Sequence, residues 1–294
     1  MLQINQCPVC NAGAFNPYLS CKDYTVSQEV FQIVNCAACG FKFTNPRPED
    51  SVIGKYYKSE DYISHSNTKK GIISKLYHFV RNYTLNQKMR LVEKHVSRGT
   101  ILDYGAGTGM FLKAAKDKNW NTYGTEPDSG ARTLASKMGL KLFGDKAKLI
   151  SEVGDSKFNA ITLWHVLEHV TDLDDTLSFF SRYLAKDGVL IIAVPNRTSY
   201  DAKYYGQFWA AYDLPRHLYH FEINSLSQLL SKYNFSLLET LPMKFDSFYV
   251  SMLSEKYKTG SIRYLSAFFF GLKSNLKAKK AADYSSVIYV FKHK

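Results

Sequence analysis

The sequence contains no run of about 18 apolar residues, so a membrane-spanning helix is not expected. Its first residues also lack the charged stretch followed by an apolar stretch that is typical of a signal peptide. We therefore expect a cytoplasmic protein. Internal repeats and low-complexity tracts are absent too, while 45% of the 294 residues are hydrophobic. This composition predicts one large buried core with a smaller appendage.

Acidic side chains are scarce: the chain has 26 Asp and Glu against 38 Lys and Arg, a formal net charge of +12. The excess indicates an anionic partner, such as a nucleic acid, a sugar nucleotide or an acidic membrane surface, without choosing between them. The basic residues are unevenly distributed along the chain, because residues 256–294 contain nine of them and only one acidic residue, Asp283. The alternative interpretation is a solvated basic surface on terminal helices.

Cysteine is rare, with five residues, but four of them form two C-x-x-C pairs, Cys7 with Cys10 and Cys36 with Cys39. This spacing is typical of a four-thiolate zinc site. Disulfides are the competing interpretation and are disfavoured in a reducing cytosol. Four thiolates leave no open coordination position, so the predicted zinc ion is structural. Cys21, between the pairs, is expected to be a small buried hydrophobe.

The zinc-ribbon module is expected to comprise residues 1–46. Zinc ribbons often bind nucleic acid, but residues 7–43 contain only two basic side chains, Lys22 and Lys42. The positive charge of the chain therefore lies mainly outside the ribbon. A nucleic-acid partner is not favoured.

A linker and a helical cover are predicted for residues 47–98. Prolines on either side of Arg47 restrict the backbone there. Apolar side chains recur at approximate helical spacing over residues 74–97, which predicts a helix. We expect this helix to lie over a ligand cleft of the domain formed by residues 99–294.

A glycine-rich segment, TILDYGAGTGMFLKAAK, has the pattern of a strand, a tight turn and a helix, which is typical of a nucleotide-binding α/β unit. Glu126 follows the next predicted strand, where an acid can accept hydrogen bonds from both ribose hydroxyls. NAD is one candidate ligand, but its fingerprint has the spacing G-x-G-x-x-G. Here Gly105, Gly107 and Gly109 are evenly spaced and Asp103 precedes them. An acidic loop suits a cationic ligand better than a pyrophosphate.

Together with the segments GTEPD, FNAITLWHVLEHVTDLDDTL and LIIAVPN, this loop resembles the class I S-adenosylmethionine-dependent methyltransferases. It looks most like the subgroup related to quinone and sugar methyltransferases, some of which carry a four-cysteine zinc module. The resemblance implies an α/β fold: a Rossmann-like seven-stranded sheet with helices on both faces, here joined to a small N-terminal zinc ribbon. It also implies S-adenosylmethionine as methyl donor and S-adenosylhomocysteine as product, and it does not specify the acceptor.

The same resemblance implies where the donor binds. Asp103, Gly105 and Gly107 would hold its methionine part and the loop, Glu126 its ribose, and Pro127 would lie beside the adenine. Asp145 would lie near the adenine amino group, although the match there is loose. The residues implied to contact the donor are Asp103, Tyr104, Gly105, Gly107, Glu126, Pro127, Asp145, Trp164 and His165.

A long insertion, residues 197–223, follows the fifth predicted strand at the carboxyl edge of the sheet, where open α/β sheets bind ligands. It contains the segment DLPRHLYHF. Histidine titrates near neutral pH, so we expect His217 to be the general base, with His220 or Asp213 orienting its ring.

Other side chains of this insertion are expected to bind the acceptor. Arg216 would bind a phosphate or another anionic group, while Tyr212 and Trp209 would stack against a sugar or ring. In the alternative interpretation, Arg216 and the histidines only hold the loop to the sheet through hydrogen bonds.

The expected function is methyl transfer to a small molecule, a sugar or a sugar nucleotide. One alternative acceptor is a lipid-linked glycan, with residues 261–280 lying on an anionic bilayer, although ordinary core packing of that segment is the favoured interpretation. RNA is another. A third hypothesis is a nucleic-acid-binding zinc ribbon whose α/β domain only senses a nucleoside. The methylated atom (oxygen, carbon or nitrogen) and the oligomeric state have no signature in the sequence.

Overall fold

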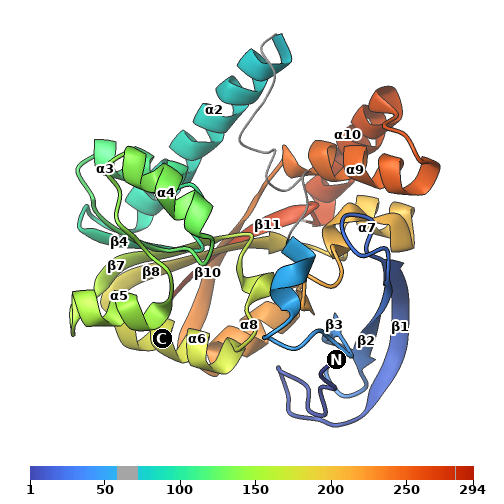
Figure 1. Ribbon diagram of the computed structural model, residues 1–294, viewed down its shortest axis with the longest axis horizontal. Helices are drawn as coiled ribbons and strands as arrows, with labels where there is room; N and C mark the ends of the chain where they lie inside the picture. The colour runs from blue at the N-terminus through green and yellow to red at the C-terminus, as the bar shows by residue number, and fades with distance from the viewer. Residues whose placement is uncertain (58–71, 282) are drawn as a thin grey trace.

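A computed structural model describes residues 1–57, 72–281 and 283–294 (Figure 1). Its larger sheet has seven strands in the order β10-β11-β8-β7-β4-β5-β6. Neighbouring strands from β8 to β6 pair in parallel, whereas β11 is antiparallel to both β8 and β10. The seven-stranded α/β sheet expected from the sequence is therefore confirmed. Its strands are β4 (Thr100–Tyr104), β5 (Asn121–Thr125), β6 (Leu142–Phe143), β7 (Phe158–Trp164), β8 (Leu184–Pro195), β10 (Phe235–Pro242) and β11 (Ser286–His293).

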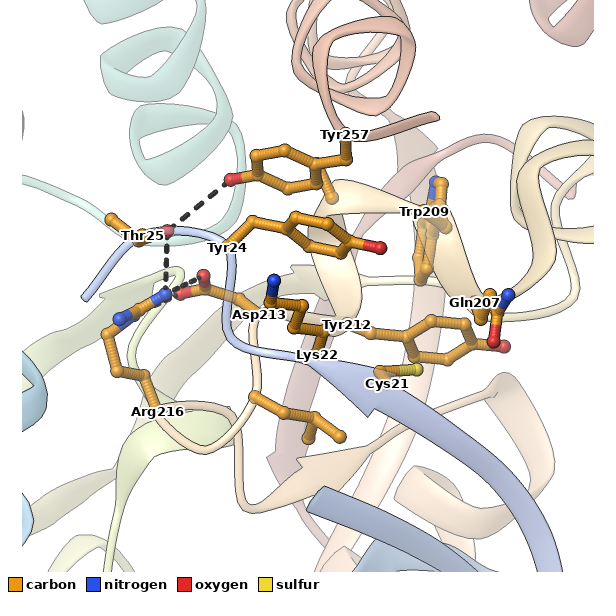
Figure 2. A pocket seen from close by; sticks show the side chains of 12 residues that line it. Cys21, Lys22, Tyr24, Thr25, Gln207, Trp209, Tyr212, Asp213, Arg216 and Tyr257 are labelled. Atoms are coloured by element: carbon orange, nitrogen blue, oxygen red, sulfur yellow. Dashed lines mark hydrogen bonds and ion pairs between the residues drawn. The ribbon is translucent and has the colours of Figure 1, made fainter. Parts of the chain in front are cut away.

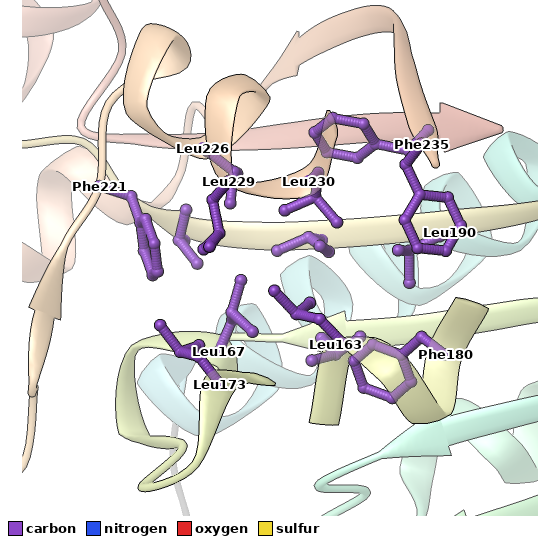
Figure 3. Close-up of a cluster of buried hydrophobic side chains, with 14 of the residues drawn as sticks. Leu163, Leu167, Leu173, Phe180, Leu190, Phe221, Leu226, Leu229, Leu230 and Phe235 are labelled. Atoms are coloured by element: carbon purple, nitrogen blue, oxygen red, sulfur yellow. The ribbon is translucent and has the colours of Figure 1, made fainter. Parts of the chain in front are cut away.

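The central strands are apolar on both sides because helices cover both faces of this sheet. In β8, Leu190 and Ile192 pack in one hydrophobic cluster, while Ile191 and Ala193 pack in the other. Figure 3 shows the first cluster, to which α6 and α8 contribute leucines and phenylalanines. The helices of the α/β domain are α2 (Ile72–His95), α3 (Met110–Asp117), α4 (Ser129–Lys137), α5 (Lys146–Val153), η3 (Leu167–His169), α6 (Leu173–Tyr183) and α8 (Ile223–Ser231).

The expected helix over residues 74–97 corresponds to α2, which packs against α3 through Met89 and Val92. The Asp172 side chain caps α6, the helix that follows η3, by accepting a hydrogen bond from the Asp175 backbone amide. Part of the predicted linker, residues 58–71, lies outside the described residues.

The N-terminal segment forms a second sheet, and the insertion completes it. Its order is β1-β2-β3-β9, in which β9 (Tyr219–His220) comes from the insertion and pairs antiparallel with β3. Phe41 and Phe43 of the N-terminal segment pack in the same cluster as Leu218 and Phe221 of the insertion. The hydrophobic core is thus continuous between the two sheets. The other strands are β1 (Phe15–Lys22), β2 (Val30–Cys36) and β3 (Lys42–Thr44), with η1 (Ile53–Tyr57) after them.

The remaining helices gather beside the N-terminal sheet (Figure 1). They are α7 (Tyr200–Tyr205), η4 (Gly206–Phe208), η5 (Ala210–Tyr212), α9 (Asp246–Thr259) and α10 (Tyr264–Ala281). Core packing is the favoured expectation for residues 261–280. It holds for Phe270, whose ring stacks on Tyr204 at 3.8 Å, but it is wrong for most of the other large apolar side chains of α10. Leu265 is 88% exposed and Phe268 is 60% exposed. Within the described residues, no helix is both long and apolar enough to cross a membrane.

Candidate cofactor and acceptor site

The glycine loop joins β4 to α3 at the carboxyl edge of the larger sheet. Gly105 and Gly109 have φ angles of +77° and +79°, in the left-handed region that favours glycine. A Cβ atom at Gly105 would lie 2.6 Å from the Val166 side chain, whereas one at Gly107 would meet no protein atom within 4 Å. The loop is therefore tightly packed beneath Gly105 and open above Gly107, which leaves room for a ligand to approach its backbone.

Glu126 lies directly after β5 and faces this loop. Its Oε2 accepts a hydrogen bond of 2.8 Å from the Gly107 amide, and its Oε1 accepts one of 2.9 Å from the Asp128 amide. A carboxylate has about four lone-pair sites, so both oxygens retain the capacity to accept ribose hydroxyls. Glu126 therefore lies beside the glycine loop, and its contact with the ribose stays a prediction. The neighbouring Pro127 contributes its carbonyl oxygen as a 2.7 Å acceptor for Arg132.

Asp103, the acid before the loop, is only 3% exposed and accepts a hydrogen bond of 2.7 Å from Thr162. Burial raises the pKa of Asp103 to about 7, although Thr162 and the charge of Lys88 act in the opposite direction. Such a carboxylate is stabilised by a cation, and the sulfonium and ammonium groups of S-adenosylmethionine are cations. Its neighbour Tyr104 packs edge-on against Phe180, with ring centroids 5.2 Å apart.

Lys88 of α2 covers this edge. Its Nζ lies 4.1 Å from the centroid of the Trp164 ring, and burial lowers its pKa while the charges of Asp103 and Asp246 raise it. The same Trp164 ring packs edge-on against Phe111 of α3 at 5.3 Å. The predicted helical cover therefore brings a cation to the site, which sequence reasoning missed because only the spacing of apolar residues in α2 was informative.

His165 follows β7 with a φ angle of +59°, which is uncommon for a residue other than glycine. Its Nε2 lies 3.0 Å from Oδ2 of Asp246, and its Nδ1 lies 3.6 Å from Oε1 of Glu168. Burial alone would lower the pKa of His165, but the two carboxylates raise it to about 10. The ring remains partly exposed, with 34% of the side chain accessible. Asp246 gave no sequence signal, because only the fold brings the start of α9 to the end of β7.

Asp145 lies at the surface instead of in a pocket. Its side chain caps α5 by accepting a hydrogen bond of 2.8 Å from the Lys148 amide, and it also pairs with the Lys148 ammonium group. The predicted contact between Asp145 and adenine stays a prediction. Capping already accounts for an acid at this position.

Arg216 is buried at the junction of the two sheets (Figure 2). Its Nε and Nη2 donate to Asp213, its Nη1 donates to the Tyr56 carbonyl at 2.8 Å, and its Nη2 also donates to Thr25 at 3.0 Å. Asp23 lies 3.4 Å from the guanidinium group. These acceptors occupy the donors of Arg216, so the structure matches the alternative interpretation, in which Arg216 holds the insertion in place, and leaves it no free donor for an acceptor molecule.

The aromatic side chains expected to bind the acceptor are also in the core. Trp209 and Tyr212 are 2% and 3% exposed and contact each other edge-on at 5.0 Å. The Trp209 indole donates a hydrogen bond of 2.8 Å to Asp201. They line a small pocket with Cys21 of β1 and Tyr257 of α9 (Figure 2). Stacking of these two rings on an acceptor has no support from their contacts.

The two histidines of the segment DLPRHLYHF are buried as well. His220 lies in β9, 3.3 Å from the Thr44 hydroxyl, and burial lowers its pKa well below the ordinary value. His217 is 8% exposed, and its Nδ1 lies 2.9 Å from the Ala211 carbonyl oxygen. Its Nε2 lies 4.0 Å from Glu168 and 3.9 Å from Asp213. Of the expected catalytic group, the structure therefore brings His217 and Asp213 together and places His220 in the N-terminal sheet.

The four paired cysteines converge within the N-terminal segment, from the turn before β1 and the turn between β2 and β3. The Sγ atoms of Cys7 and Cys39 are 3.6 Å apart, and those of Cys10 and Cys36 are 3.5 Å apart. One ligand atom from each cysteine lies within 4.8 Å of all the others. The thiols are free, and Cys21 is buried outside this cluster as expected.

The sequence matches the model of a methyltransferase domain over residues 76–240, more than half of the chain. The chain belongs to this methyltransferase family. An uncharacterized methyltransferase of Anoxybacillus flavithermus is 29% identical over 161 residues, which cover 51% of this chain and 74% of the relative. A ubiquinone biosynthesis O-methyltransferase of Rickettsia prowazekii is 24% identical over 50% of this chain and 62% of its own length.

The fold has a counterpart among solved structures. Magnesium protoporphyrin IX methyltransferase from Synechocystis PCC 6803, solved with S-adenosylhomocysteine, superposes with a TM-score of 0.54 at 12% identity, covering 84% of this chain and all of that one. The family and the glycine-loop site together make this chain an S-adenosylmethionine-dependent methyltransferase. It is an enzyme, and a protein that only senses a nucleoside is no longer a tenable hypothesis.

Donor binding by this methyltransferase should depend on the ionisation of Asp103. Because its pKa is raised to about 7, the carboxyl is protonated at lower pH and then no longer attracts a cationic donor. From about pH 8 to about pH 6, we expect the Kd for S-adenosylmethionine to rise roughly tenfold. Calorimetric titration measures it. The Asp103→Asn variant should bind S-adenosylmethionine weakly, and its Kd should no longer depend on pH in this range. If the Kd of the wild type were the same at both pH values, Asp103 would not be the group that attracts the donor.

Proposed function

We propose that this methyltransferase methylates a small anionic or sugar-like molecule at the carboxyl edge of its larger sheet. The observation that carries the proposal is the convergence of the glycine loop, Asp103 and Glu126 with the His165–Asp246 pair at one edge. Val166, the residue after His165, packs beneath Gly105. The donor loop and the histidine are therefore immediate neighbours. The excess of basic residues and the resemblance to quinone and sugar methyltransferases support an anionic or sugar-like acceptor.

The chemistry makes modest demands on the protein. The nucleophilic atom of the acceptor attacks the methyl carbon, the carbon–sulfur bond breaks, and its electron pair stays on sulfur to give S-adenosylhomocysteine. A proton leaves the acceptor if the nucleophile carries one. Because the methyl group is already activated, alignment of the two reactants and exclusion of water supply most of the rate enhancement.

His165 is the side chain best placed to align the acceptor. Its partly exposed ring is held by Asp246 at the end of β7. His217, by contrast, is enclosed between the two sheets. We therefore assign His165 a positioning role, in which the ring hydrogen-bonds the acceptor next to the methyl donor. His217 is not needed as the general base in this arrangement.

Labelling with methyl-labelled S-adenosylmethionine and a fractionated bacterial extract tests the function. Label in polar small molecules is expected, whereas label confined to RNA would contradict the proposal. With the acceptor so identified, His165→Gln should lower kcat by about 10²-fold through misalignment. Its Kd for the donor should stay within about twofold of wild type, since the glycine loop is untouched. Equal losses of donor binding and turnover would assign His165 to the donor site instead.

We also infer that Cys7, Cys10, Cys36 and Cys39 bind a structural zinc ion. With Zn–S bonds of about 2.3 Å, a tetrahedral site separates its sulfurs by about 3.8 Å. The sulfur separations of 3.5 and 3.6 Å are close to that value, so the cluster fits the ion. Gly40, with a φ angle of +74°, forms the turn after the second pair. Bound zinc would stabilise the edge of the N-terminal sheet.

Zinc content and thermal unfolding check this inference. Cys10→Ser should lose the thiolate-bound zinc and lower the Tm of the protein, because a thiolate-bound metal contributes directly to folding. Cys21→Ala, which changes the buried cysteine outside the cluster, should retain the ion. A zinc content that is the same in wild type and Cys10→Ser would refute the site.

A second candidate function, methylation of a membrane-anchored acceptor, is favoured by the orientation of α10. The small residues of this helix are buried: Ala267, Ser274 and Ala278 are at most 3% exposed. A Cβ at Gly271 would lie 2.8 Å from the Phe248 ring of α9, so the small face is the one that packs on the protein. Most of the large apolar residues point the other way, with Phe270 as an exception because it stacks on Tyr204. The large apolar side chains of α10 that are at least 40% exposed are Tyr264, Leu265, Phe268, Phe269, Leu272 and Leu276.

Charge indicates what could cover this apolar stripe. The segment 256–281 contains seven basic residues and no acidic residue. Two copies of the chain meeting here would bring like charges together, whereas an anionic lipid surface complements both the apolar and the basic groups. The apolar surface also includes Phe245 and Tyr249, at 44% and 45% exposure, on either side of Asp246. A membrane bound there would lie close to the His165–Asp246 pair.

Sedimentation with vesicles tests this second candidate. Wild type should bind vesicles that contain phosphatidylglycerol, more weakly at high salt, and should not bind neutral phosphatidylcholine vesicles. Leu265→Ser with Phe268→Ser should weaken binding by tenfold or more, since each buried apolar side chain contributes about 1.5–3 kcal/mol. Leu134→Ser, an exposed leucine of α4, is the matched control and should bind like wild type. Binding unaffected by the double substitution would exclude α10 as the contact.

A further inference from the structure

A cluster of three electron-rich side chains lies beside the acceptor edge, and neither methyl transfer nor the cysteine site uses it. Glu168 and His169 belong to η3, just after β7, and His217 comes from the insertion. A carboxylate oxygen of Glu168 and one ring nitrogen of each histidine lie within 4.8 Å of one another. Glu168 is 1% exposed and His217 is 8% exposed. A backbone hydrogen bond joins the two segments here, since the Leu218 amide donates to the Glu168 carbonyl at 2.7 Å.

Glu168 has an unusual environment for a buried carboxylate. Within the described part of the chain, neither of its carboxylate oxygens accepts a hydrogen bond. The nearest ring nitrogens, on His165 and His217, are 3.6 and 4.0 Å from Oε1, which is longer than a hydrogen bond. Buried carboxylates are ordinarily paired, hydrogen-bonded or bound to a metal. Nε2 of His165 lies against Asp246, while its Nδ1 faces Glu168 at a distance too long for a hydrogen bond. His165 supplies a positive charge nearby, but among the described residues no donor reaches the carboxylate oxygens of Glu168.

The hydrogen bonds of the histidines show where their lone pairs lie. A carbonyl oxygen can only accept, so Nδ1 of His217, 2.9 Å from the Ala211 carbonyl, carries a proton. Nδ1 of His169 likewise lies 3.0 Å from the Arg216 carbonyl, with the Tyr57 hydroxyl at the same distance. In a neutral ring, the remaining Nε2 then presents a lone pair. For His217, that is the nitrogen that faces Glu168.

In the described part of the chain, Nε2 of His217 and the unpaired oxygens of Glu168 thus face each other without a donor between them, and a ring nitrogen of His169 lies within 4.8 Å of both residues' ligand atoms. Histidines that bind metals typically show this same pattern: one ring nitrogen binds the ion and the other donates its proton to a backbone carbonyl or a carboxylate. The rings of His169 and His217 meet edge-on with centroids 4.5 Å apart, as two ligands around one centre can.

We propose that Glu168, His169 and His217 bind a divalent transition-metal ion, separate from the zinc of the cysteine cluster. Two imidazoles and one carboxylate suit Zn²⁺, Fe²⁺, Co²⁺ or Mn²⁺ better than Ca²⁺ or Mg²⁺. Three protein ligands leave at least one coordination position open, in contrast to the four thiolates. The ion neutralises Glu168 and ties the insertion to the end of β7, three residues from His165.

Metal counting tests the proposal on the full chain. Protein is dialysed against Co²⁺, passed through a desalting column and assayed for metal, with its absorption spectrum recorded. Wild type should retain two ions per chain, one with an intense thiolate charge-transfer band and one with weaker nitrogen–oxygen bands. Glu168→Gln and His217→Gln should each retain only the thiolate-bound ion. Cys10→Ser should retain only the other ion, so failure of the cysteine site and failure of this site are distinguishable.

His220→Gln is the matched control, because His220 is a buried histidine of the same segment that contacts Thr44 and not the cluster. It should retain both ions. A wild-type protein with one ion that Cys10→Ser removes would overturn the proposal, as would two ions in both Glu168→Gln and His217→Gln. If either outcome is found, a second proton on His217 would serve Glu168 in place of the metal ion. That proton would be visible in the ¹⁵N chemical shifts of the His217 ring. If a variant fails to fold, as judged by circular dichroism, the wild-type count alone decides.

Discussion

Arg216 is the interaction on which the arrangement of the two sheets depends. Its guanidinium group binds Asp213 in its own segment, Thr25 and Asp23 beyond β1, and the Tyr56 carbonyl in η1. A buried, fully hydrogen-bonded charge of this kind cannot lose a partner without leaving an uncompensated charge, which typically costs about 3–5 kcal/mol. The contact fixes the insertion between the sheets, lets β9 pair with β3, and so brings the histidines of the insertion to the end of β7.

The methyl-donor site follows from the parallel sheet. Strands β4, β5 and β7 end at one edge, and their carboxyl ends contribute Asp103, Glu126 and His165. The backbone at this edge is held in conformations that few residues tolerate, since Gly105 and His165 both have positive φ angles. Helix α2 closes the edge with Lys88. The result is a sheet edge that combines buried acids with cations, as a positively charged donor and the proposed anionic acceptor together would require.

Much of this could be predicted from residues close in sequence. The apolar segments, the glycine loop, the acid after β5 and the cysteine spacing each indicate local geometry. The seven-stranded sheet was implied by the resemblance to a known family, and that prediction was correct. The roles of Arg216, Trp209, Tyr212 and His220 could not be, because each depends on acceptors or neighbours from distant segments. An arginine or histidine in a long loop has the same local pattern whether it faces a ligand or, as here, the core.

The sequence alone therefore determined the fold class, the donor and the grouping of the four cysteines, since periodicity and short spacings follow directly from backbone geometry. Only the tertiary structure decided which titratable groups meet, namely Asp246 with His165, and Glu168 with His169 and His217. It also decided that the large apolar face of α10 is exposed to solvent. The physical reason is that the packing between elements determines which groups contact a buried charge or an apolar surface. The residue pattern within one element does not indicate which other element packs against it.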